Sequence, residues 1–112
     1  MKKDDCIFCK IANGEFGTDF ILETEDIVAF RDINPQAAEH ILVIPKEHYE
    51  NIIEVQSSEL LAKLLQGVQA VTQKIGLTSF RTVINTGKDA GQTVFHVHIH
   101  ILGGQELNST FN

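Results

Sequence analysis

The sequence has few of the features that mark membrane-spanning, disulfide-stabilised or nucleic-acid-binding proteins. Its 112 residues include no tryptophan, one methionine, two prolines and two cysteines. No apolar run approaches the roughly 18 residues of a membrane-spanning helix. The 9 lysine and arginine residues are outnumbered by 15 acidic residues, whereas nucleic-acid polymers are bound mainly by cationic side chains on phosphates. We therefore expect no membrane and no nucleic acid polymer as partners, a balance that still allows one nucleotide held locally.

The length and the apolar content are those of one small globular domain. Hydrophobic residues make up 43% of the chain and charged residues 21%, which is typical of a soluble protein with its own core. The stretch MKKDDCIFCK becomes acidic at once and contains no apolar segment of the kind that a signal peptide needs. We therefore predict a single domain over 1–112 and a cytoplasmic location.

The two cysteines form the pair Cys6-Ile-Phe-Cys9. A structural disulfide is not expected in a cytoplasmic chain, and nothing before Cys6 supplies the strand that a thioredoxin-like redox motif follows. A C-x-x-C pair provides two ligands of a tetrahedral zinc site, and histidines elsewhere can supply the others. The residues favour zinc, with reduced free thiols and redox chemistry as the alternatives.

Hydrophobic periodicity predicts more strands than helices. Apolar residues at helical spacing indicate a long helix over 57–75 and a short helix over 6–13. Gly67 in the long helix suggests close packing there, with a merely tolerated glycine as the alternative. Short apolar runs between turn residues predict strands at 20–22, 27–30, 40–44, 80–85 and 93–102. Because the elements lack a repeated strand–helix–strand rhythm, the sequence predicts an α+β fold with an antiparallel sheet.

Three of the five histidines stand at alternate positions in the segment FHVHIHIL over 95–102. Successive side chains of a strand point to opposite faces, so His96, His98 and His100 are expected on one face. The β-branched residues between them then belong to the core. Histidine is the side chain that titrates nearest neutrality, so three imidazoles about 7 Å apart along a strand favour a binding or catalytic face over a merely solvated one.

Two mechanisms suit three such histidines. In the first, they hold a catalytic metal that activates water. In the second, one neutral imidazole attacks an electrophile while its neighbours stabilise the developing negative charge. The loop NTGKDAGQT over 85–93 contains two glycines, amide side chains and hydroxyl groups, and its flexible backbone can offer N–H donors to phosphate oxygens. Its place before the histidines makes phosphorus the favoured electrophile.

Five segments together carry a resemblance to a known family: CIFCKI over 6–11, AFRDINP over 29–35, HILVIPKEH over 40–48, GQTV over 91–94 and HVHIHIL over 96–102. The chain resembles the Hint-like branch of the histidine triad (HIT) superfamily, of the zinc-bearing bacterial type. The resemblance implies an α+β meander of about five strands with one long and one short helix. It also implies a homodimer whose sheets join, and hydrolysis of nucleoside 5′-phosphoramidates with purine nucleotides.

The resemblance also implies roles for individual residues. His98 would attack the α-phosphorus and carry the nucleotidyl group covalently until water releases the nucleoside monophosphate. The phosphate and the leaving group would be contacted by His40, His100, Asn85 and Thr93, with backbone N–H groups near Thr93 and Val94. Asp32 would hold the ribose hydroxyls. The base pocket would be lined by Ile7, Phe8, Ile11, Phe30 and Ile33, each of which also has an ordinary interpretation as a core residue.

Zinc gains a full ligand set from the same resemblance. The set would be Cys6, Cys9, His48 and His96, closed by protein and therefore structural, with one ion per chain. Two other functions stay open beside the phosphoramidase. One is hydrolysis of dinucleoside polyphosphates, and the other is a nucleotide- or zinc-binding regulatory protein with little turnover.

Overall fold

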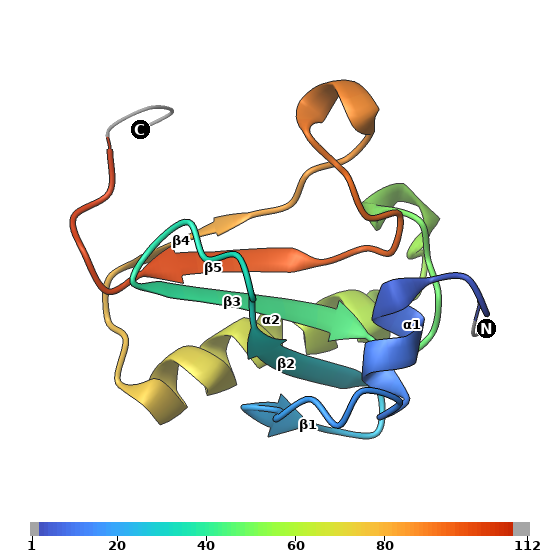
Figure 1. The fold of residues 1–112 in the computed structure, drawn as a ribbon, viewed down its shortest axis with the longest axis horizontal. Coiled ribbons are helices and arrows are strands. Elements are labelled where there is room, and N and C mark those ends of the chain that lie inside the picture. The colour runs from blue at the N-terminus through green and yellow to red at the C-terminus, as the bar shows by residue number, and fades with distance from the viewer. Residues whose placement is uncertain (1–2, 109–112) are drawn as a thin grey trace.

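The computed structural model describes residues 3–108 as one α+β domain (Figure 1). Its α-helices are α1 (Ile7–Ala12) and α2 (Ser58–Ile75). Its strands are β1 (Leu22–Glu23), β2 (Ile27–Arg31), β3 (Glu39–Pro45), β4 (Phe80–Val83) and β5 (Ile99–Gly103). Two short 3-10 turns are η1 (Ile52–Glu54) and η2 (Lys88–Ala90). Within residues 3–108, no helix is both long and apolar enough to cross a membrane.

The five strands form one antiparallel sheet in the order β1-β2-β3-β5-β4. The predicted α+β class, with one long and one short helix, is confirmed. The last strand lies between β3 and β4, so that Leu42 is paired with His100 and His40 with Leu102. This order brings two histidines that are far apart in the sequence to neighbouring strands.

The sheet buries side chains on both of its faces. On one face, α2 covers Ile41, Val43, Ile99 and Ile101, which are all at most 1% exposed. On the other face, α1 covers a second cluster that contains Val28, Phe30, Leu42 and Ile44. Alternation along β3 therefore sends Ile41 and Val43 towards α2, whereas His40 and Leu42 share the face on which α1 lies. Figure 1 shows α1 at one end of the sheet and α2 running across its other face.

The long helix has the ends and the close packing that its sequence predicts. The Ser57 hydroxyl accepts a hydrogen bond from Leu60 N–H at 3.1 Å, and Gly76 ends the helix in the left-handed conformation with φ of 72°. A Cβ atom on Gly67 would lie 2.5 Å from Ile27 Cδ1 and 3.1 Å from Val43 Cγ1. Because both side chains are buried in the core, the glycine allows α2 to approach the sheet.

The histidine segment differs from its prediction. A continuous strand over 93–102 was expected, yet β5 begins at Ile99, and residues 91–98 form turns and irregular backbone. The three histidines consequently do not share one open face of a strand. His96 is fully buried, His98 is 7% exposed and His100 is only partly buried. The physical reason is that Val97 N–H donates to Tyr49 O at 2.7 Å, so this segment is held by a loop rather than by a neighbouring strand.

Candidate functional site

A cavity of about 630 Å³ opens on the α1 side of the sheet. Ten of its lining residues were predicted as site residues: Ile7, Phe8, Ile11, Phe30, Asp32, Ile33, His40, Thr93, Val94 and His100. The wall is apolar where α1 lines it and polar at Asp32, His40, Thr93 and His100, as in ligand sites that combine an apolar lining with a few polar groups. The structure therefore brings together residues from α1, β2, β3, β5 and the loop before β5.

His98 lies beside this cavity with its ring fixed in one tautomer. Its ring packs edge-on against Phe8 and His100, with centroid distances of 5.1 and 4.9 Å. His98 Nδ1 lies 2.7 Å from the backbone carbonyl oxygen of His96, and a carbonyl can only accept. His98 Nδ1 therefore carries the proton, and Nε2 keeps its lone pair as a nucleophile or base.

The tautomers of His40 and His100 follow from a second chain of hydrogen bonds. Gln36 N–H donates to His40 Nδ1 at 2.9 Å, which places the proton of a neutral His40 on Nε2. That nitrogen lies 2.9 Å from His100 Nδ1 and 3.6 Å from an Asp32 carboxylate oxygen. His40 therefore donates to His100, whose own proton is left on Nε2 as a donor for a ligand.

Burial lowers the pKa of two histidines of this site, His98 and His100. Desolvation lowers the pKa of His98 below its usual value, although the hydrogen bond to the His96 carbonyl opposes the shift. Desolvation, aided by repulsion from His98 and His40, lowers the pKa of His100 to about 4. At neutral pH the site therefore presents an uncharged His98 with a free Nε2 lone pair, which is the form that can attack an electrophile.

Backbone donors complete the polar wall. Thr93 and Val94 line the cavity, and among residues 3–108 the backbone N–H groups of these two residues have no hydrogen-bond partner. Unpaired N–H groups near a nucleophile are suited to negative charge that develops on phosphate oxygens.

Asp32, His40 and His100 are close enough together to be considered as a metal site. Their hydrogen bonds argue against it. A metal on His40 Nε2 would require the proton to move to Nδ1, where it would meet the N–H of Gln36. A catalytic metal on the three histidines of 96–100 is not supported either, because the free nitrogen of His96, Nδ1, faces the sulfurs of Cys6 and Cys9 instead.

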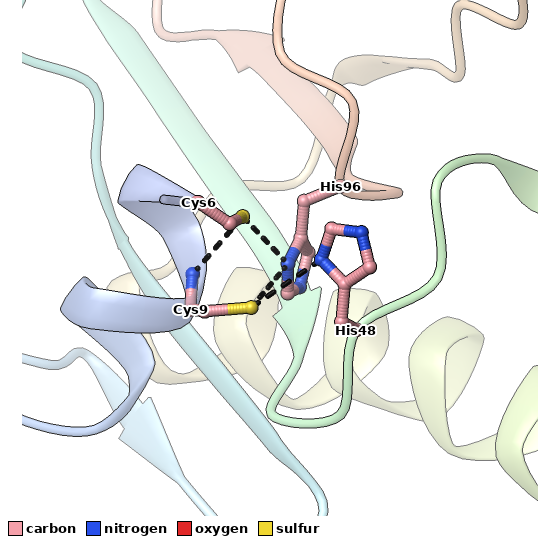
Figure 2. Close-up of side chains that lie close together, drawn as sticks. All are labelled: Cys6, Cys9, His48 and His96. Atoms are coloured by element: carbon pink, nitrogen blue, oxygen red, sulfur yellow. Dashed lines mark hydrogen bonds between the residues drawn. The ribbon is translucent and has the colours of Figure 1, made fainter. Parts of the chain in front are cut away.

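A second cluster does have the donors of a metal site. Figure 2 shows the side chains of Cys6, which caps the N-terminus of α1, and Cys9, within α1, facing the rings of His48 and His96 from two different loops. Cys9 Sγ lies 3.3 Å from His48 Nδ1 and 3.4 Å from His96 Nδ1, and Cys6 Sγ lies 3.4 Å from His96 Nδ1. The four ligand atoms all lie within 4.8 Å of one another.

The geometry and protonation of this cluster fit a tetrahedral ion. Zinc–sulfur and zinc–nitrogen bonds in a tetrahedron separate S and N by about 3.6 Å, close to the distances observed. His96 Nε2–H donates to Pro45 O at 2.8 Å, which leaves Nδ1 as the metal-binding nitrogen. Cys9 Sγ accepts from Lys3 N–H and Cys6 Sγ accepts from Cys9 N–H, at 3.4 Å each. Desolvation nevertheless raises the pKa of the Cys9 thiol, so a bound cation would be needed to hold it as a thiolate. Both cysteines are free rather than joined.

One predicted residue lies outside the cavity lining, and one buried residue of the nearby loop was not predicted. Asn85, predicted on the leaving-group side, lies two residues after β4 and does not line the cavity. Gln92 received no role from the sequence, yet its side chain is 2% exposed and fully hydrogen-bonded. Its polar character within a loop gave no signal that it would be buried. The cavity also includes Thr18 and Gln36, which no motif identified.

Comparison with known proteins agrees with this geometry. The HIT domain profile matches residues 13–107. The chain belongs to the HIT family. It is 49% identical over 107 residues to a HIT-like protein of Synechococcus elongatus, covering 93% of this chain and 94% of the relative. It is 46% identical over 103 residues to the protein HitA of Neisseria gonorrhoeae, covering 89% and 96%.

Solved HIT structures share the whole fold. A HIT family hydrolase from Legionella pneumophila Philadelphia 1 superposes with a TM-score of 0.89 at 43% identity, covering 95% of this chain and 98% of that one. A histidine triad protein from Clostridium difficile gives a TM-score of 0.90 at 40% identity, covering 96% and 97%. The fold similarity therefore covers nearly the whole of this HIT protein.

The lowered pKa of His100 predicts how stability depends on pH. Its pKa is about 4 in the folded chain and about 6.5 in an unfolded one, so between these values only the unfolded state binds the proton. Stability is therefore lost as the pH falls from 6.5 towards 4. Urea unfolding across this range should give a shallower dependence for His100→Asn than for the wild type. Equal slopes would contradict a neutral, desolvated His100.

Proposed function

We propose that this protein hydrolyses nucleoside 5′-phosphoramidates, with purine nucleotides, through a covalent nucleotidyl–histidine intermediate on His98. The observation that carries the proposal is the hydrogen bond from His98 Nδ1–H to the His96 carbonyl, because it leaves Nε2 free beside the cavity. Family membership and the hydrolase descriptions of related structures from Legionella pneumophila and Clostridium thermocellum support the reaction class.

The proposed reaction has two displacement steps at phosphorus. His98 Nε2 attacks the α-phosphorus, the P–N bond to the leaving amine breaks, and the amine departs with the bonding electron pair and takes up a proton from solvent. Water then attacks the same phosphorus and releases a proton to solvent, the P–Nε2 bond breaks with its electron pair returning to Nε2, and the nucleoside monophosphate leaves. The covalent intermediate thus replaces one difficult displacement with two easier ones.

The surrounding groups have complementary roles in this proposal. The His100 Nε2–H and the free N–H groups of Thr93 and Val94 would stabilise the charge on the phosphate oxygens. The Asp32 carboxylate would accept hydrogen bonds from ribose hydroxyls. The base would lie against the apolar wall formed by Ile7, Phe8, Ile11, Phe30 and Ile33. A role of Asn85 on the phosphate and leaving-group side is proposed from the family resemblance, since Asn85 does not line the cavity.

Loss of the His98 ring should abolish turnover without emptying the nucleotide pocket. With a fluorogenic adenosine phosphoramidate, we expect His98→Ala to reduce kcat/KM by about 10³-fold or more, because a nucleophile is removed. Adenosine monophosphate should still bind to the variant in calorimetry.

The wild-type result distinguishes the alternatives. No hydrolysis above the His98→Ala background would indicate a regulatory binding protein. Faster cleavage of a dinucleoside polyphosphate than of the phosphoramidate would assign the protein to that substrate class.

We propose that the ion in the cysteine–histidine cluster is zinc and that it is structural. All four donors are protein atoms, so the coordination shell of Cys6, Cys9, His48 and His96 has no open position for water. When bound, the zinc would connect α1 to the loops that carry His48 and His96. The chemical steps above need only His98 and its neighbours.

Removal of the two thiols should lower the zinc content and the thermal stability more than it lowers the hydrolysis rate. We expect Cys6→Ser with Cys9→Ser to lose about one equivalent of zinc per chain and to melt at a lower temperature, because metal that binds only the folded state stabilises it. Metal analysis and thermal unfolding measure both effects, with His98→Ala as the control that keeps its zinc. Zinc retained by the cysteine variant but lost from His98→Ala would instead indicate a metallohydrolase.

We propose that the protein is a homodimer in which the β4 edges of two sheets meet. β4 is an edge strand, and Phe80 and Ile84 at its two ends are 39% and 38% exposed. On α2, Leu65 is 58% exposed. An unpaired strand edge flanked by exposed apolar side chains is suited to pairing with a second copy.

Sedimentation should show a species of twice the 12.5 kDa chain mass at micromolar concentration. We expect Ile84→Lys to shift it towards the monomer, because a lysine on the strand edge opposes pairing. Phe16→Lys is the matched control, since Phe16 is 58% exposed but precedes β1 at the opposite edge. A monomeric wild type, or equal effects of the two variants, would contradict the β4 interface.

A further inference from the structure

Gln92 is a buried amide in a loop whose neighbouring residues face the cavity. Its side chain is 2% exposed, whereas Gly91, Thr93 and Val94 line the cavity wall. All the hydrogen-bonding atoms of the amide have partners. Gln92 Oε1 accepts from Gly87 N–H at 2.9 Å, and Nε2–H groups donate to Glu50 O at 2.5 Å and to Val94 O at 3.1 Å.

The first of these bonds closes the loop on itself. Gln92 N–H also donates to Gly87 O at 3.1 Å, so the two residues are joined in both directions across the base of η2. Gly87 and Gly91 have φ of 92° and 94°, values that glycine adopts readily and other residues do not. The loop therefore has a fixed shape, and its end is set where Thr93 begins.

The other two bonds fix where that end lies. The Glu50 carbonyl belongs to the segment after β3, in which Tyr49 O accepts from Val97 N–H and His48 enters the cysteine–histidine cluster. Gln92 Nε2 joins this segment to the Val94 carbonyl. The backbone between Gln92 and Val97 is thus held against residues 48–50 at both ends, and the free N–H groups of Thr93 and Val94 lie within this span.

From these contacts we infer that Gln92 is a positioning residue for the phosphate side of the site. It contacts no substrate itself. Its Nε2 donates to the carbonyl oxygens of both Val94 and Glu50 and so fixes the backbone at Val94. In this way it aims the N–H groups of Thr93 and Val94 at the phosphate oxygens. The inference rests on the proposed function for its effect on turnover, whereas its effect on phosphate binding can be measured separately. Donors must be accurately placed to stabilise a transition state, and a shift of about 1 Å can cost about 10²-fold in rate.

The test replaces the amide by a carboxylate of the same shape. Gln92→Glu keeps an acceptor for Gly87 N–H but loses both Nε2 donors and sets negative charge against two carbonyls. We expect kcat for the adenosine phosphoramidate to fall about 10²-fold and KM to rise by a smaller factor. Calorimetry should show weaker binding of adenosine monophosphate and unchanged binding of adenosine, which lacks the phosphate. Gln69→Glu makes the same change on the exposed face of α2 and should leave all of these values unchanged.

A purely structural role would give a different pattern. In that case Gln92→Glu would lower the melting temperature while folded protein kept its kcat and its affinity for the monophosphate, and the inference would be overturned. Equal weakening of adenosine and monophosphate binding would also overturn it. Gln92→Met, which removes the polar atoms without adding charge, gives the same test if the glutamate variant does not fold. A wild type that binds the monophosphate but hydrolyses no phosphoramidate would overturn the proposed function, and the binding comparison would still test Gln92.

Discussion

The hydrogen bond between His98 Nδ1–H and the His96 carbonyl oxygen, 2.7 Å long, decides which nitrogen of His98 can react. It can do so only if the backbone at His96 is itself fixed. The His96 ring donates to Pro45 O on one side and meets both cysteine sulfurs on the other, while the next N–H donates to Tyr49 O. The cysteine–histidine cluster and the reactive His98 therefore share one short segment. Contacts that fix His96 within the cluster also fix the orientation of the His98 ring.

The two faces of the sheet divide the physical demands on the fold. The α2 face is a packed aliphatic core in which Gly67 allows a close approach of helix and strands. The opposite face contains buried polar groups, among them His40, His96 and His98. Burial without partners would be costly for such groups, yet each of these three rings has a hydrogen-bonding partner that also selects its tautomer. The apolar core under α2 therefore holds in place the strands that carry the buried histidines of the opposite face.

The sequence predicted the α+β fold because its signals were local and periodic, whereas the roles of the site residues came from the resemblance to the HIT family. The limits of α2 followed from Ser57 and Gly76, and the apolar alternation located the strands. The alternation in the histidine segment predicted a strand over 93–102, yet β5 begins only at Ile99. Alternating polar and apolar residues therefore did not distinguish a strand from the irregular backbone before it. The pairing of β3 with β5 and the burial of Gln92 depend on contacts between distant residues, which one sequence does not reveal.

The central claim is that His98 Nε2 becomes covalently bonded to phosphorus during turnover. Rapid acid-free quenching of the wild type with an adenosine phosphoramidate, followed by peptide mass spectrometry, tests it most directly. We expect an adenylyl group on the peptide that contains 95–102, assigned by fragmentation to His98, present during turnover and absent after the substrate is consumed. Steady hydrolysis with no adduct at any time, or an adduct assigned to His100 that persists in His98→Ala, would contradict the account.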